Sequence, residues 1–180
     1  LRISTEVMTG SWEALREGRA DLILAIGDPP SGFAQQTKRL RDIEFVFCVA
    51  PQHPLARVKH PLTRDDLLAH TAIVVADSAR LLPARNIGLL SGKSRITVSN
   101  IEAKIALQIA GLGYGFLPRC RIDAALTKRE LVAREVAEPR ASEPLWLAWN
   151  PEAEGEAQKW WRMRLQVPGA LESPLPAREA

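Results

Sequence analysis

The feature that most constrains the fold is a repeated alternation between short apolar runs and segments with helical spacing. The runs that indicate buried strands are DLILAIG (21–27), IEFVFCVA (43–50) and TAIVVA (71–76), and RITVS (95–99) indicates a further strand. Nearly continuous apolar runs of this length are typical of strands covered on both faces, as in parallel sheets. The segments between several of these runs have helical spacing. This order predicts an α/β fold with mainly parallel sheets.

The first 27 residues predict a compact strand–helix–strand unit. β-Branched residues at alternating positions indicate a strand over residues 1–7. Either Thr9 or Ser11 can cap the helix that follows, and Gly18 is expected to end it. The apolar run 21–27 completes the unit.

Three glycines in the stretch QIAGLGYGFLPR, residues 108–119, raise the question of a phosphate-binding loop. A dinucleotide fingerprint places its glycines after a strand and before a helix. Here an amphipathic helix capped by Asn100 comes first and a strand, 114–118, comes after. The glycines are therefore expected to end the helix and to allow a close return into the sheet. The apolar stripe expected on this helix consists of Ile101, Ile105, Ile109 and Leu112.

Taken together, these motifs resemble the effector-binding domain of LysR-type transcriptional regulators. The segments that carry the resemblance are LREGRADLILAIG, FVFCVAPQHPLA, LTRDDLLAHTAIV, AGLGYGFLPR and EPLWLAWN, in this order. The resemblance covers residues 1 to about 167. It implies a two-lobed fold like that of periplasmic binding proteins, in which each lobe is a mainly parallel sheet flanked by helices and two crossover strands join the lobes. We expect lobe I at 1–47 plus 145–167, lobe II at 48–144, and a disordered tail at 168–180.

The resemblance also suggests which parts of such a regulator the chain represents. In this family an N-terminal winged helix-turn-helix binds promoter DNA, and the effector domain starts with a strand and a helix. Only fourteen residues separate LRISTEV from DLILAIG, a spacing that fits the second and third strands of the family. We therefore expect that the chain begins after the DNA-binding domain and after the first strand and helix.

A ligand site is expected between the lobes, beyond the carboxyl ends of the strands, where helix N-termini favour anions. Two junctions of this kind stand out, EVMTGS and VSNIE. The candidate ligand-binding residues are Val7, Met8, Thr9, Gly27, Asp28, Asp77, Ser78, Ser99, Asn100, Tyr114, Gly115 and Phe116. Thr9, Ser99 and Asn100 have a structural alternative as helix caps, and Met8 and Phe116 have one as core residues. The Tyr114 hydroxyl can hydrogen-bond either the ligand or the backbone. The adaptable apolar side chain of Met8 favours an aromatic or alkyl carboxylate as the effector.

The motifs of catalysis and metal binding do not occur in the sequence. His53, His60 and His70 fit no zinc spacing, no G-x-S-x-G is present, and Cys48 is expected to be an inert buried thiol. We expect no enzyme activity, cofactor or metal. The two cysteines, Cys48 and Cys120, do not make a disulfide framework, so we expect a reducing, cytoplasmic compartment. The net charge of +3 is dispersed, and no apolar run reaches the length of a membrane span. Family resemblance implies a homodimer or homotetramer. A periplasmic-type solute-binding protein and an enzyme on the same fold remain alternatives.

Overall fold

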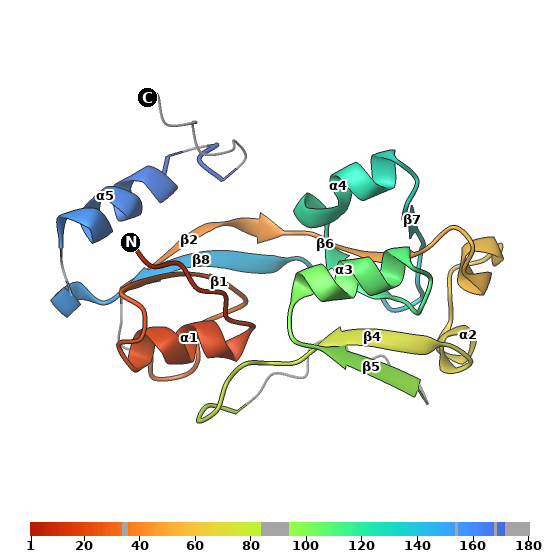
Figure 1. The fold of residues 1–180 in the computed structure, drawn as a ribbon, viewed down its shortest axis with the longest axis horizontal. Coiled ribbons are helices and arrows are strands. Elements are labelled where there is room, and N and C mark those ends of the chain that lie inside the picture. Colours follow the sequence, from red (N-terminus) through yellow and green to blue (C-terminus); the bar gives the residue numbers. More distant parts are fainter. Residues whose placement is uncertain (34–35, 84–93, 154, 168, 172–180) are drawn as a thin grey trace.

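The computed structural model describes residues 1–33, 36–83, 94–153, 155–167 and 169–171, and its elements gather into two groups along the long axis (Figure 1). We call the group that contains the elements from both ends of the chain the terminal half. It contains α1 (Thr9–Arg16), β1 (Leu22–Ile26), β2 (Gln36–Ile43), β8 (Glu143–Trp149), a 3-10 turn (Pro151–Ala153) and α5 (Glu156–Leu165). The central half contains β3 (Phe45–Val49), a 3-10 turn (Pro54–Arg57), α2 (Arg64–Leu68), β4 (Thr71–Val75), β5 (Ser94–Val98), α3 (Ile101–Ile109), β6 (Gly115–Pro118), α4 (Arg119–Thr127) and β7 (Val132–Ala133).

Most strand pairs in the described residues are antiparallel, so the prediction of mainly parallel sheets is wrong. The terminal half has a three-stranded sheet of order β1-β8-β2, and β8 runs antiparallel to both neighbours. In the central half β3 lies antiparallel to β6 and to β7, whereas β4 and β5 pair in parallel. For β3 the apolar run correctly predicted side chains that are buried or half-buried on both faces. An apolar run does not specify the direction of a strand, because that direction depends on how the chain connects one strand to the next. The returning chain brings β8 into the first sheet from the opposite end.

Strand β2 was missed because its sequence, QTKRLRDI, is polar. Most of its side chains are exposed, and its backbone pairs with β8 from Gln36 opposite Trp149 to Ile43 opposite Glu143. Strand β3 begins two residues after β2 ends, and it belongs to the other sheet. The chain therefore passes from the terminal half to the central half at Glu44.

The predicted strand over residues 1–7 does not form. Leu1 and Ile3 are 88% and 81% exposed, and no described strand pairs with this segment. Without a neighbouring strand, the β-branched pattern has no ladder of hydrogen bonds to join. The N-cap of α1 is Met8, with a φ of 50°, and not Thr9 or Ser11. The end of α1 follows the prediction, because Gly18 adopts a φ of 69° directly after the C-cap.

Helix α3 packs its predicted apolar residues Ile101, Ile105 and Ile109 against the core, although they are only partly buried. Lys104 and Gln108 are its buried side chains, whereas Leu112, just beyond the helix, is 52% exposed. The Gln108 amide donates hydrogen bonds to the carbonyl oxygens of Cys48 (2.8 Å) and Gly115 (3.1 Å). These two hydrogen bonds connect α3 to β3 and β6, and they satisfy two buried backbone acceptors.

The glycines after α3 have the structural roles that their order predicted. Gly111 has a φ of 79° and follows the C-cap Ala110, so it ends the helix. At Gly113 a Cβ would lie 2.3 Å from the carbonyl oxygen of Thr71, so the absence of a side chain allows β4 and the start of β6 to meet. Gly115 is the first residue of β6.

None of the helices in the described residues is long and apolar enough to cross a membrane. The tail predicted to be disordered, 168–180, lies outside the described residues apart from 169–171.

Candidate functional site

A cavity of about 460 Å³ lies between the two halves. This volume is in the range of pockets that hold small molecules. The terminal half contributes apolar side chains from the segment before α1 and from its sheet. The central half contributes side chains from β4, β6 and α3. The apolar lining residues include Val7, Met8, Leu24, Ile26, Ile43, Phe45, Ile73, Val75, Ile101, Phe116 and Leu145. The cavity is thus mainly apolar and needs both halves to be complete.

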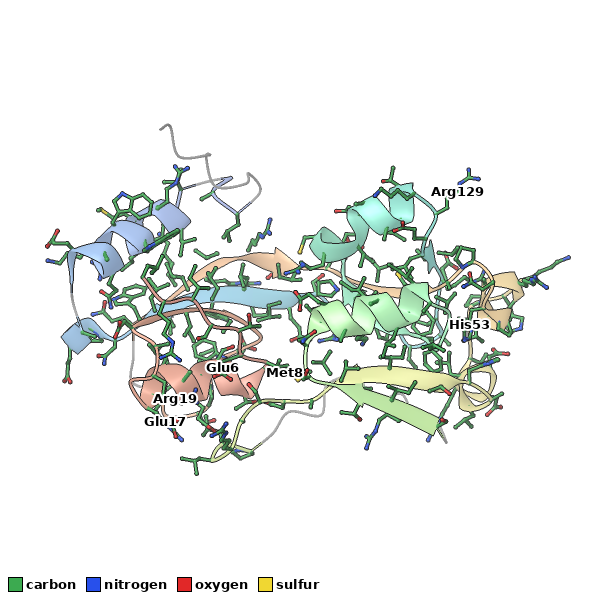
Figure 2. All side chains as sticks on the ribbon, viewed as in Figure 1. Glu6, Met8, Glu17, Arg19, His53 and Arg129 are labelled. Carbon is green, nitrogen blue, oxygen red and sulfur yellow. The ribbon has the colours of Figure 1, made fainter. Side chains whose placement is uncertain are left out.

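Four of the predicted ligand residues line this cavity, namely Val7, Met8, Gly115 and Phe116. Figure 2 shows Met8 at the end of α1 that faces the central half. Phe116 is 7% exposed, and it also packs in the core against Phe47 with ring centroids 5.4 Å apart. Phe116 therefore belongs both to the hydrophobic core and to the cavity wall.

The other eight predicted residues lie at four places around the fold. Thr9, Asp77 and Ser78 meet at the start of α1, Ser99 and Asn100 precede α3, Gly27 and Asp28 follow β1, and Tyr114 is in the core. The phenol of Tyr114 is fully buried and donates a hydrogen bond of 3.1 Å to the carbonyl oxygen of Leu67. Burial raises the pKa of Tyr114. Of its two expected partners, ligand or backbone, this structure pairs Tyr114 with the backbone.

The N-terminus of α1 already has an anionic partner within the chain. The Asp77 carboxylate accepts hydrogen bonds from the backbone N–H groups of Thr9 (3.3 Å) and Gly10 (3.2 Å). The next residue, Ser78, accepts from the N–H of Val7 at 2.8 Å and donates to the Glu6 carboxylate at 2.6 Å. A carboxylate at this position compensates the positive end of the helix dipole, as an anionic ligand would.

A second carboxylate, which the sequence analysis did not single out, joins α1 to the same segment. Glu13 is fully buried and accepts hydrogen bonds from the N–H groups of Arg80 (3.0 Å), Leu81 (2.8 Å) and Leu82 (2.9 Å). Bonds from Leu82, Leu81 and Arg80, with the charge of Arg19, lower the pKa of Glu13 to about 2 against the cost of burial. The signal that could have found it is an acidic residue between Trp12 and Ala14, in a helix whose other residues from Thr9 to Leu15 are uncharged. We call the contacts between residues 6–13 and residues 77–82 the α1 junction.

The start of α3 is capped as the sequence predicted. The Asn100 side-chain oxygen accepts a hydrogen bond of 2.8 Å from the N–H of Ala103. Both helix N-termini that were expected to attract an effector therefore have protein partners for at least part of their free N–H groups.

The sequence analysis also missed Lys104, the most buried cationic side chain of the cavity wall. Lys104 is 8% exposed and lines the cavity from α3. Burial and the nearby charge of Arg140 lower the pKa of Lys104 to about 8. Its position offered a signal, because it lies three residues after Ile101 and four before Gln108, on one face of the helix.

The Cys48 thiol and the His53 imidazole are buried in the protein and have structural roles. Cys48 is fully buried, and burial raises its pKa to about 12, as expected for an inert thiol. His53 accepts a hydrogen bond from the N–H of Leu55 at 3.2 Å. Over the described ranges, no group of three or more metal-ligating side chains comes together.

Two α/β halves that enclose a small-molecule cavity define a ligand-sensing or solute-binding class of domain. A family model described as the LysR substrate binding domain matches residues 1–166. The chain therefore belongs to the LysR substrate-binding domain family. Domains of this family are the effector-binding regulatory domains of transcriptional regulators, and the family is not enzymatic.

The curated relatives are HTH-type transcriptional regulators. The chain is 40% identical to YeeY of Escherichia coli (strain K12), over 95% of this chain and 56% of that protein. It is 35% identical to the activator AllS of Salmonella paratyphi A, over 86% of this chain and 50% of that protein. The chain thus spans about half the length of the curated relatives it matches.

Solved structures share the fold at low sequence identity. The regulatory domain of MetR from N. meningitidis matches with a TM-score of 0.62 and 22% identity, over 90% of this chain and 77% of that one. The reduced regulatory domain of OxyR2 from Vibrio vulnificus matches with a TM-score of 0.63 and 19% identity, over 89% and 76%. These likenesses support the LysR regulatory-domain fold.

Proposed function

We propose that the chain senses a small effector in the cavity between its two halves. The halves act as lobes that correspond to those predicted at 1–47 plus 145–167 and at 48–144, with the whole of β3 assigned to the second lobe. The observation that carries this proposal is the cavity itself, because neither half encloses it alone. An effector that binds one arrangement of the lobes more tightly shifts the population toward it. The α1 junction is the contact that such a shift would remake, since it joins residues 6–13 to residues 77–82.

The effector class that fits the cavity is an aromatic or alkyl carboxylate. Apolar residues from both halves, such as Leu24, Ile73 and Phe116, would bury its hydrocarbon part. Burial of a ring or chain against both halves at once would couple binding to the angle between them.

In the whole protein we propose that this domain controls a DNA-binding helix-turn-helix. The names of YeeY and AllS as HTH-type regulators support this proposal. We further propose a cytoplasmic regulator that works as a homodimer or homotetramer on promoter DNA. Family membership favours this function over a periplasmic-type solute-binding protein and over an enzyme on the same fold.

Filling the cavity tests the proposal. Leu24 lines the cavity from β1 and is 39% exposed, so Leu24→Trp should fill space there while leaving the chain folded. Leu112→Trp is the matched control, because Leu112 is an exposed leucine at the far end of α3. Benzoate and hexanoate should raise the melting temperature of the unmodified chain and of Leu112→Trp, but not that of Leu24→Trp. Equal stabilisation of all three proteins would place the ligand outside the cavity.

A further inference from the structure

One cationic side chain in the cavity wall, Lys104, has no counter-charge among the residues that the structure describes. Lys104 is 8% exposed, and within the described residues its ammonium has no hydrogen bond or ion pair. An uncompensated buried charge is costly, and proteins normally pair such groups or neutralise them. The lowered pKa of about 8 reflects that cost, yet leaves the ammonium largely protonated near neutral pH.

The other ionised side chains of the wall are engaged. Glu143 pairs with Arg140, and Glu6 pairs with Arg19 at 2.7 Å. Arg121 pairs with Glu102 at 2.6 Å, and Arg41 also has an interaction within the chain. Neither acid of the wall is therefore available to Lys104, which leaves it the cation best placed to receive an anion.

The residues around Lys104 provide space, positive charge and apolar surface for an anionic ligand. A Cβ on Gly115 would lie 3.0 Å from the Lys104 Nζ, so the missing side chain makes room for the ammonium over β6. The Arg140 guanidinium stacks on Phe45, 3.5 Å from the ring centroid, and adds positive potential nearby. Ile73 and Phe116, which also line the cavity, supply apolar surface beside this charge.

We propose that the Lys104 ammonium binds the carboxylate of the effector, and that the effector carries a single acidic group on an apolar body. This inference rests on the proposed function of the cavity. It differs from the expectation that helix N-termini bind the anion, because Asp77 and Asn100 already occupy those positions. A monoanion matches Lys104, because the other cations of the wall already have partners within the chain.

The test compares acids with their uncharged amides by isothermal titration calorimetry. Benzoate and hexanoate are titrated against benzamide and hexanamide, with terephthalate as the dianion. The proteins are the unmodified chain, Lys104→Met, Leu24→Trp and the control Lys59→Met, which removes an exposed lysine. Lys104→Gln serves as a second variant, so that a folding defect in one substitution does not decide the result.

The expected result is that the monoacids bind the unmodified chain and Lys59→Met more tightly than the amides or terephthalate. Both Lys104 variants should weaken the monoacids by about tenfold or more and remove the preference over amides. Unchanged acid affinity in folded Lys104 variants, with binding lost in Leu24→Trp, would overturn the role of Lys104 and leave the cavity as the site. Failure of all the acids to bind the unmodified chain would overturn both proposals.

Discussion

Asp77 and Gly10 lie 3.2 Å apart, carboxylate oxygen to backbone nitrogen, and this hydrogen bond helps to join the central half to the start of α1. The contact leaves no room for a side chain at position 10, because a Cβ there would lie 1.9 Å from the hydroxyl oxygen of Ser78. The chain itself therefore supplies the anion that this helix end attracts. A change in the arrangement of the halves at this edge must break or remake the bond.

Removal of the Asp77 carboxylate should destabilise the chain. Asp77→Ala leaves the N–H groups of Thr9 and Gly10 without this acceptor, and the loss of a helix cap costs about 1 kcal/mol of unfolding free energy. Urea denaturation followed by circular dichroism measures the change. Asp123→Ala, which removes an exposed carboxylate paired with Arg119, is the control and should have a smaller effect. Equal losses in both variants would argue against the capping role.

Glu13 should make stability depend on pH in the acidic range. Its pKa is about 2 in the folded chain and 4.5 as the ordinary value, so the folded state favours the ionised form. The stabilisation is complete above about pH 4.5 and is lost as the pH falls from there through about 2. Glu13→Gln removes this ionisation. Its free energy of unfolding should therefore fall less steeply than that of the unmodified chain as the pH is lowered over this window.

The matched control for Glu13 is Glu130→Gln, which changes an exposed side chain. Urea denaturation at a series of pH values between 5 and 2.5, a range chosen around the two pKa values, measures all three proteins. Parallel pH profiles for Glu13→Gln and the unmodified chain would show that the carboxylate is not stabilised in the folded state.

Local chemistry made several parts of the fold predictable. The cap Asn100 and the helix-ending Gly111 act on residues within four positions of themselves, so their patterns can be read along the chain. The apolar run of β3 likewise predicted that the side chains of this strand are buried. None of these signals contains the direction of a strand, and so the antiparallel pairing of β8 with β1 and β2 was not foreseen.

The parts of the candidate site that sequence reasoning missed depend on distant segments. Glu13 meets the N–H groups of residues 67 to 69 positions away, and Lys104 is buried because β6 packs beneath α3. Charged residues are usually exposed, so a glutamate or lysine within a helix predicts a solvent face by default. The fold overrides that default at both positions, and it gives Glu13 a structural role and Lys104 the binding role that we propose for it.

The two expected roles of Tyr114 are separable by one substitution. Tyr114→Phe removes the hydroxyl that bonds the Leu67 carbonyl and keeps the ring in the core, next to Phe47. Loss of a buried hydrogen bond should lower the unfolding free energy by about 1 kcal/mol. Benzoate affinity, measured by calorimetry, should stay within about twofold of the unmodified value, which is well under 1 kcal/mol. A folded variant of unchanged stability that binds benzoate poorly would instead assign the hydroxyl to the ligand.

The glycine-rich stretch after α3 gives a final prediction about packing. Gly113→Ala would place a methyl group 2.3 Å from the Thr71 carbonyl oxygen and 2.9 Å from the Ile73 side chain. The backbone oxygen belongs to β4, which is held by β5, so relief requires the strand to shift. We expect a loss of about 1–3 kcal/mol in unfolding free energy, the usual cost of forcing atoms into a packed core. Gly155→Ala, where a Cβ meets open space, is the control and should cost less in the same urea titration.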